Sequence, residues 1–245
     1  MSRRRVAAQA RFELRLLARN GENLLVTFVI PLAVLVFFTT VPVLPTGDHA
    51  AVDLLTPGTM TLAIMGSAMV SLGISTGFER DQLVLKRLAV TPLRRSELVA
   101  AKTLAVIALI GVQMILLLAT AFVLGWRPAP TPVGILVAVV GLLLASFAFA
   151  GIGLAIAGRL PALRSLAVIN LVFLAFLILA GVIVPLDALP APLALLAQGL
   201  PPAWTTALLH ATLGELGPPW PLPLAVLTGW CALAVLLASR TFRWE

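Results

Sequence analysis

Residues 79–102 read ERDQLVLKRLAVTPLRRSELVAAK and separate two apolar runs, 58–77 and 102–125. Nine of these 24 residues are charged, in a chain that is 60% hydrophobic and only 11% charged. An ordinary soluble domain is roughly a quarter charged, so this pattern indicates a protein of the membrane. The stretch predicts a short charged helix on a membrane surface, between two transmembrane helices.

The chain contains six apolar runs of membrane length. A spanning helix needs about 20 predominantly apolar residues. Backbone groups in lipid must bond internally, and these runs lack the polar–apolar alternation of barrel strands, so we expect helices. The expected spans are about 24–43, 58–77, 102–125, 132–157, 163–185 and 222–239. The predicted fold class is therefore an all-α integral membrane protein, with one transmembrane domain over 1–245.

The basic residues predict the orientation in the membrane. The net charge is +7, and 16 of the 17 lysines and arginines fall on one side if six spans alternate. Arg127 is the exception. Because positive charge is retained in the cytoplasm, we expect both termini there. Topology thus accounts for the basic charge, and nucleic acid is not an expected partner.

Residues 3–19 predict an amphipathic helix on the inner leaflet. The apolar face carries Val6, Ala10, Leu14 and Leu17. The basic face carries Arg4, Arg11, Arg15 and Arg19. A basic face beside an apolar one suits an interfacial helix that contacts anionic lipid headgroups.

Small residues and prolines indicate two further features. Gly73 and Gly77 stand four apart in the second span, which favours a close helix–helix contact inside the bundle. Pro57-Gly58 is expected to close an outer loop before that span. Residues 186–213 are apolar but interrupted by proline, which predicts short helices dipping into the outer leaflet, with a plain outer loop as the alternative.

Within the charged segment, the sequence predicts a short helix, a fixed turn and a new helix. Leu83, Val84, Leu85 and Leu88 should share one side of the short helix. Pro92 disfavours helix at Thr91. Ser96 is expected to cap the next helix, with Glu97 in its first turn.

The sequence of this segment resembles the inner loop of type-2 ABC transporter permeases. These are the membrane subunits of bacterial drug, lipid and polysaccharide exporters, including daunorubicin-resistance-like ones. The matching elements are Phe78-Glu79-Arg80-Asp81-Gln82, Leu85-Lys86-Arg87-Leu88, Thr91-Pro92-Leu93-Arg94-Arg95 and Lys102. The family's usual Gly-Thr before the leucine-rich element is replaced by Leu83-Val84. The order of the interfacial helix, the six runs and the proline-rich outer element at 186–213 is also similar to the family.

The resemblance implies a coupling helix region at 79–95 that contacts a separate ABC ATP-binding subunit. The implied contact residues are Glu79, Arg80, Leu83, Leu85, Lys86, Arg87, Leu88, Thr91, Pro92, Arg94 and Arg95. It also implies an elbow helix at 3–19, re-entrant helices at 186–213, a second permease copy and a bacterial plasma membrane. ATP and magnesium would be bound by the partner, because the sequence has no Gly-x-x-x-x-Gly-Lys-[Ser/Thr] loop. We expect no cofactor, metal or catalytic residue in this chain.

The expected function is export of a hydrophobic drug- or lipid-like substrate, with polysaccharide or another amphiphile as the alternative. A membrane enzyme or an ion-coupled transporter would be expected to carry ionisable residues inside its spans, and these runs have none near their centres. A structural or immunity membrane protein without transport activity has the same sequence features and stays open.

Overall fold

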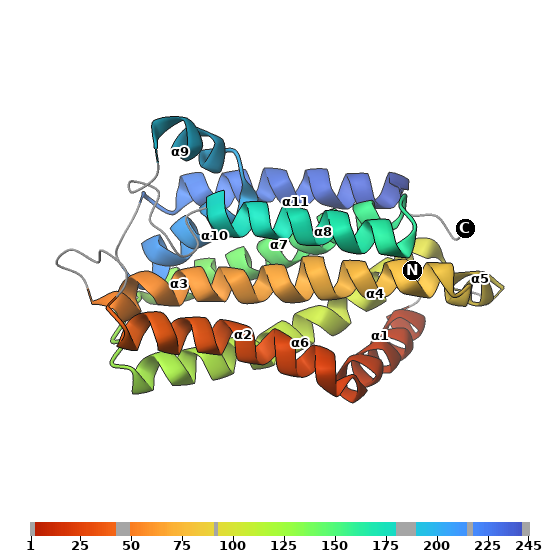
Figure 1. Cartoon of the computed structure of the whole chain (residues 1–245), viewed down its shortest axis with the longest axis horizontal. Coiled ribbons are helices and arrows are strands. Elements are labelled where there is room, and N and C mark those ends of the chain that lie inside the picture. Colours follow the sequence, from red (N-terminus) through yellow and green to blue (C-terminus); the bar gives the residue numbers. More distant parts are fainter. Residues whose placement is uncertain (1–2, 43–49, 91–92, 180–189, 215–217, 242–245) are drawn as a thin grey trace.

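A computed structural model describes residues 3–42, 50–90, 93–179, 190–214 and 218–241. These residues form helices and connecting turns without a strand, arranged as an elongated bundle (Figure 1). The helices are α1 Arg3–Arg19, α2 Gly21–Thr40, α3 Ala51–Ile64, η1 Met65–Ser71, α4 Leu72–Asp81, α5 Val84–Ala89, α6 Arg95–Val123, α7 Pro132–Ala157, α8 Ala162–Leu179, α9 Ala191–Gln198, α10 Pro201–Leu209, η3 His210–Gly214 and α11 Pro221–Thr241.

Five segments of the described chain are long and apolar enough to cross a membrane. They are Asn23–Thr40, Ala51–Asp81, Ser96–Val123, Pro132–Ala157 and Pro221–Thr241. They correspond to five of the six expected spans. The sixth, expected at 163–185, overlaps α8, whose apolar part Ala162–Ile178 is shorter, and residues 180–185 lie outside the described residues.

The second span begins earlier than the sequence predicted. The expected loop end at Pro57-Gly58 is wrong, because α3 begins at Ala51 and Pro57 lies inside it. Membrane helices tolerate such a proline where nearby hydroxyls and neighbouring helices satisfy the backbone. Thr56 Oγ1 donates to Val52 O at 2.7 Å and Thr61 Oγ1 donates to Pro57 O at 3.0 Å, whereas the carbonyl that loses its helical N–H partner at Pro57 is that of Asp53. The turns around Pro57 are also buried by protein.

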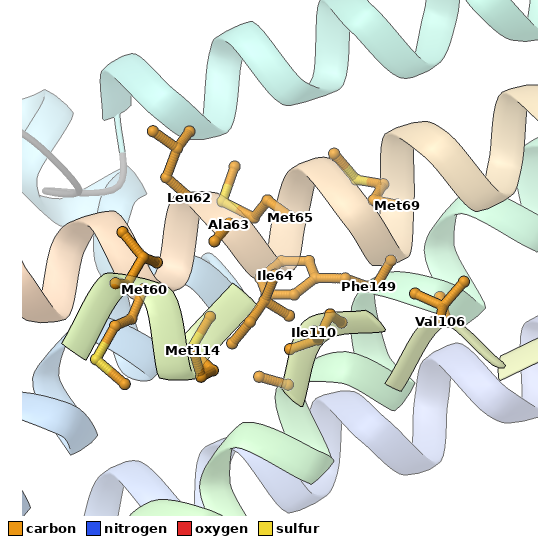
Figure 2. Close-up of a cluster of buried hydrophobic side chains, with 14 of the residues drawn as sticks. Met60, Leu62, Ala63, Ile64, Met65, Met69, Val106, Ile110, Met114 and Phe149 are labelled. Atoms are coloured by element: carbon orange, nitrogen blue, oxygen red, sulfur yellow. The ribbon is translucent and has the colours of Figure 1, made fainter. Parts of the chain in front are cut away.

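Segments α3, η1 and α4 form one continuous helix, Ala51–Asp81, which we call the central helix. Its spanning window is 72% buried, against 11% for α2, so it lies inside the bundle as predicted. Its middle packs against α6 and α7 through Ile64, Met65, Ile110, Met114 and Phe149 (Figure 2).

Glycines bring the central helix close to its neighbours. A methyl group on Gly73 would lie 2.8 Å from Ile169 Cδ1 and 3.1 Å from Gly153 Cα. One on Gly77 would lie 3.4 Å from Ser165 Cβ. The close contact predicted from Gly73 and Gly77 is therefore confirmed.

The π-helical turn η1 is held by side chains from two other helices. Ser67 Oγ donates to Gln113 Oε1 at 2.9 Å, and Gln113 Nε2 donates to Thr27 O at 2.7 Å. Asn23 Nδ2 donates to Ser71 Oγ at 2.7 Å. Polar contacts thus connect α2, η1 and α6 in an otherwise apolar layer. Single-turn π segments often occur at functional sites.

The amphipathic pattern of residues 3–19 is confirmed as the helix α1, which packs on α6. Val6 is buried and Ala10, Leu14 and Leu17 are half-buried, whereas Arg4, Arg11, Arg15 and Arg19 are exposed. Between 190 and 214 the chain forms α9 and α10–η3, the short helices expected there, and α10 is largely buried. Residues 186–189 lie outside the described residues.

Candidate functional site

One end of the bundle gathers α1, α5, the α7–α8 turn and the start of α6 (Figure 1). At this end the central helix finishes with three consecutive charged residues, Glu79, Arg80 and Asp81, which we call the inner triplet. Each of these side chains contacts a different part of the bundle.

Glu79 connects the central helix to α6 and α1 through a buried ion pair. Lys102 Nζ lies 2.7 Å from Glu79 Oε2 and 3.0 Å from Glu13 Oε2. Gln9 Nε2 donates to Glu13 Oε1 at 2.8 Å. The Lys102 side chain is 1% exposed, so a charged group is held away from water by two carboxylates. Removing one partner of such a buried group is far costlier than breaking a surface pair.

Arg80 and Asp81 hold the turn between α7 and α8. The Arg80 guanidinium donates to Ala157 O at 2.9 Å and Leu160 O at 2.8 Å, which satisfies carbonyls at the end of α7. Asp81 Oδ2 accepts from Ala162 N at 2.9 Å at the start of α8. A carboxylate at a helix N-terminus and a cation at a C-terminus are both favourable with respect to the helix dipole.

Leu83 turns the chain from α4 into α5. Its φ is 60°, in the left-handed region, and its side chain is half exposed. The prediction that Leu83 shares the apolar side of the short helix is wrong, because it lies in the turn before α5. Leu85 does face inward and is fully buried, and Leu88 packs partly against the same core.

The outward side of this end is basic. Lys86, Arg87 and Arg94 have exposed side chains, and we call these three residues the basic tip. The next helix, α6, begins at Arg95 with Arg94 as its N-cap, so the expected cap at Ser96 is wrong. The reason is that Glu97 Oε2 accepts from Arg94 N at 3.1 Å, which fixes the helix start two residues earlier. Glu97 does lie in the first turn, as predicted.

The family model for the ABC-2 type transporter matches residues 5–213. This range runs from the first turn of α1 through most of η3 and includes the inner triplet and the basic tip. The chain belongs to the ABC-2 type transporter family. No curated protein matches the chain.

Within an ABC-2 permease this chain is the membrane component, which is not itself the ATPase. The family implies a partnership with an ABC ATP-binding subunit. The predicted contact residues divide into two groups. Glu79, Arg80, Leu85 and Leu88 are turned toward the bundle, whereas Leu83, Lys86, Arg87 and Arg94 are exposed. Thr91, Pro92 and the side chain of Arg95 lie outside the described residues.

The ABC-2 chain also uses Glu13, which the sequence did not single out, and Lys102 and Asp81, which it named only as matches to the family. Glu13 and Lys102 form the buried pair, and Asp81 caps α8. One signal could have found the first two: Glu13 is the one acid among the arginines of α1, and Lys102 is one of two lysines in the chain. Lys102 was expected at the very start of the third span, but α6 begins seven residues before it.

Replacing Leu83 with glycine is expected to stabilise the permease by about 1 kcal/mol. A non-glycine residue in the left-handed region costs about 1–3 kcal/mol, and glycine largely escapes that cost while losing more entropy on folding. Because Leu83 is half exposed, little apolar burial is lost. The check is the midpoint of thermal unfolding in detergent, with the exposed Val90→Gly as the control. A fall in the midpoint for Leu83→Gly would contradict the expectation.

Proposed function

We propose that the chain is the membrane subunit of an ATP-driven exporter in a bacterial plasma membrane. A separate ATP-binding subunit would hold ATP and magnesium and dock on the basic tip and α5. Both termini and the inner triplet would lie on the cytoplasmic side, with six spans in all. The chain would pair with a second copy. In this arrangement α1 is the elbow helix, and α9 and α10 are the re-entrant helices.

The inner triplet is the observation that carries the proposal. Three neighbouring side chains connect the helix that precedes α5 to α1, α6, α7 and α8. A displacement of α5 by a partner would therefore reach α6, α7 and α8 directly, and α1 through Lys102. A loop that served only as a positively charged anchor would need no such contacts.

The exposed part of α1 supports contact with membrane lipids. Arg11, Arg15 and Arg19 are exposed beside Phe12 and Leu16, whose side chains are 53% and 47% exposed. A helix with exposed cations and apolar residues is favoured at the surface of an anionic leaflet, because the cations attract the lipid headgroups and the apolar side chains insert between the lipids.

The proposed cargo is a hydrophobic drug- or lipid-like molecule. The spans are strongly apolar and the chain has no tyrosine and few other aromatics, whereas a polysaccharide path would be expected to stack sugars on aromatic rings. Export of a polysaccharide or another amphiphile is the second candidate, and a structural or immunity role without transport is the third.

The first test is purification of the detergent-solubilised chain from its native membrane, followed by an ATPase assay of the eluate. A stoichiometric ATP-binding subunit with ATPase activity is expected. A chain that elutes alone and without activity under gentle conditions would favour the role without transport.

Reversing the charges of the basic tip is expected to weaken association with the ATP-binding subunit. Lys86→Glu with Arg87→Glu changes two exposed residues, so folding should be unaffected while the contact surface loses its charge. Rim charges mostly change association rates and salt dependence, so we expect co-purification to fall about tenfold at physiological salt. Arg127→Glu, just beyond the other end of α6, is the control for a charge reversal away from the basic tip, although Arg127 also donates to Phe122 O and Trp126 O. Equal recovery of the ATP-binding subunit with both variants would remove the basic tip from the docking role.

A further inference from the structure

A cavity of about 500 Å³ lies beside the buried ion pair. Its walls come from α1, the start of α2, the central helix and α6. A volume of this size is typical of sites for small organic ligands. Glu13, Glu79 and Lys102 all line it, so the charged groups of the buried cluster form part of the cavity wall.

A second cavity of about 190 Å³ continues along α2. The two cavities share Asn23, Val70 and Ser71 in their walls. The second is mainly apolar, with Val26, Ile30, Leu62 and Phe173 among its lining residues. A compartment with charged groups in its wall, which we call the polar compartment, therefore joins a more apolar one. The two extend from the corner between α1 and α2 toward the middle of the bundle.

The polar compartment carries an excess of negative charge. Two carboxylates, Glu13 and Glu79, share the single ammonium of Lys102. Among the described residues that line the cavity, Lys102 is the one cation. With both carboxylates ionised the cluster has a net charge of −1. The Glu79 side chain is 23% exposed and the Glu13 side chain 9%, so Glu79 is the carboxylate that a further partner of opposite sign can reach.

We propose that the joined cavities bind a monocationic amphiphile. Its ammonium would lie beside Glu13 and Glu79, and its apolar body would follow α2 into the second cavity. Phe78 lines the same compartment and offers an aromatic ring, which attracts cations over its face. This inference rests on the proposed export function and narrows its substrate class.

The charge pattern also discriminates against other amphiphiles. A sulfate or phosphate headgroup would meet two carboxylates and an ammonium that is already paired. No arginine is among the described residues that line this compartment, so an anionic headgroup lacks the bidentate partner it usually finds in proteins. A neutral amphiphile would occupy the apolar compartment but leave the charge unbalanced.

The test is equilibrium binding of rhodamine 6G, a fluorescent monocationic amphiphile, to the detergent-solubilised chain with whatever subunits co-purify. Dodecyltrimethylammonium is expected to displace the dye, and dodecyl sulfate of the same chain length is expected to displace it at least tenfold less well. Equal displacement by the two would overturn the proposal, because the site would then select only for the alkyl chain.

Two variants at Ser75 separate charge from size. Ser75 lines the polar compartment, and its hydroxyl donates only to Leu72 O of its own helix among the described contacts. Ser75→Lys adds an ammonium beside the cluster and is expected to weaken dye binding at least tenfold. Ser75→Gln fills similar space without charge and is expected to weaken it less than threefold. Similar losses for the two variants would contradict the electrostatic basis of the site.

A variant in the second cavity tests where the apolar body lies. Gly66 lines that cavity, and a methyl group there would have no atom within 4 Å. Binding of alkyltrimethylammonium ions should tighten by up to about fourfold per methylene, from the transfer free energy of a buried CH₂. Gly66→Phe should abolish this dependence on chain length but spare tetramethylammonium. An unchanged dependence would place the alkyl chain elsewhere.

These outcomes are independent of whether the chain is an exporter. Dye binding is measured without ATP. The absence of an ATP-binding subunit would therefore refute the proposed function, but the affinity of the site for the dye could still be measured. Conversely, an active ATPase complex whose dye binding ignores Ser75→Lys would retain the proposed function and lose this inference.

Discussion

Replacing Lys102 with methionine is expected to destabilise the protein by about 3–5 kcal/mol, the cost of leaving a buried ion pair without one partner. The methionine keeps most of the apolar stem but leaves Glu13 and Glu79 facing each other without their shared ammonium. We expect the contact between α1 and the central helix to open, and ATP hydrolysis by the complex to become independent of substrate. The measurements are the thermal unfolding midpoint in detergent and the substrate-stimulated ATPase rate.

Two comparisons make this expectation specific. Lys86→Met removes the chain's other lysine, which is exposed, and should leave the unfolding midpoint unchanged. The combined variant Glu13→Gln, Glu79→Gln and Lys102→Met removes all three charges and should recover most of the stability without restoring coupling. An unfolding midpoint for Lys102→Met equal to that of the parent protein would show that the pair adds nothing to stability.

Replacing Gly153 with leucine is expected to cost about 3 kcal/mol or more and to separate α7 from the central helix. Even a methyl group at this position would lie 2.5 Å from Met69 O and 3.1 Å from Met69 Cα. These are backbone atoms of η1, so a side-chain rotation cannot relieve the overlap. The check is the yield and unfolding midpoint of the detergent-solubilised protein.

Gly111→Leu is the matched control for this substitution. Gly111 lies in α6, is exposed, and would place its methyl group with no atom within 4 Å. Its replacement should be neutral or slightly stabilising, since leucine is a better helix former than glycine. Comparable losses for the two variants would mean that the membrane, and not the contact with Met69, limits the side chain at position 153.

The length of the apolar runs predicted the positions of five spans correctly. The ends were harder, because they depend on hydrogen bonds that hydropathy does not report. Pro57 indicated a loop by its lack of an N–H, yet it lies buried inside α3, where neighbouring helices surround it. Similarly, Glu97 moves the start of α6 ahead of Ser96.

The site illustrates a second limit. The sequence singled out Glu79 and Arg80 through a resemblance, and treated them as part of a contact surface. The structure places their polar atoms on Lys102 and on the carbonyls of Ala157 and Leu160. Such partners lie from 23 to 80 residues away along the chain, and charge patterning alone does not show which distant groups meet. The exposed positions of Lys86, Arg87 and Arg94 were predictable for charges in a short surface segment, whereas the burial of Lys102 in the same segment was not.

The central helix has a consequence for events at the opposite ends of the protein. Its 31 residues extend about 45 Å at 1.5 Å per residue, and Thr206 Oγ1 donates at 3.0 Å to Thr61 Oγ1, twenty residues before Asp81. A displacement of Asp81 along the helix axis would therefore be transmitted to α10 through this single continuous helix. The π turn η1 lies between Thr61 and Asp81 and can change how the two halves of the central helix are rotated relative to each other. If η1 tightened to α-helical geometry by one residue, the two halves would rotate relative to each other by about 100°. Gln113 and Asn23, which form hydrogen bonds with Ser67 and Ser71 in that turn, are the side chains that stabilise the π-helical geometry.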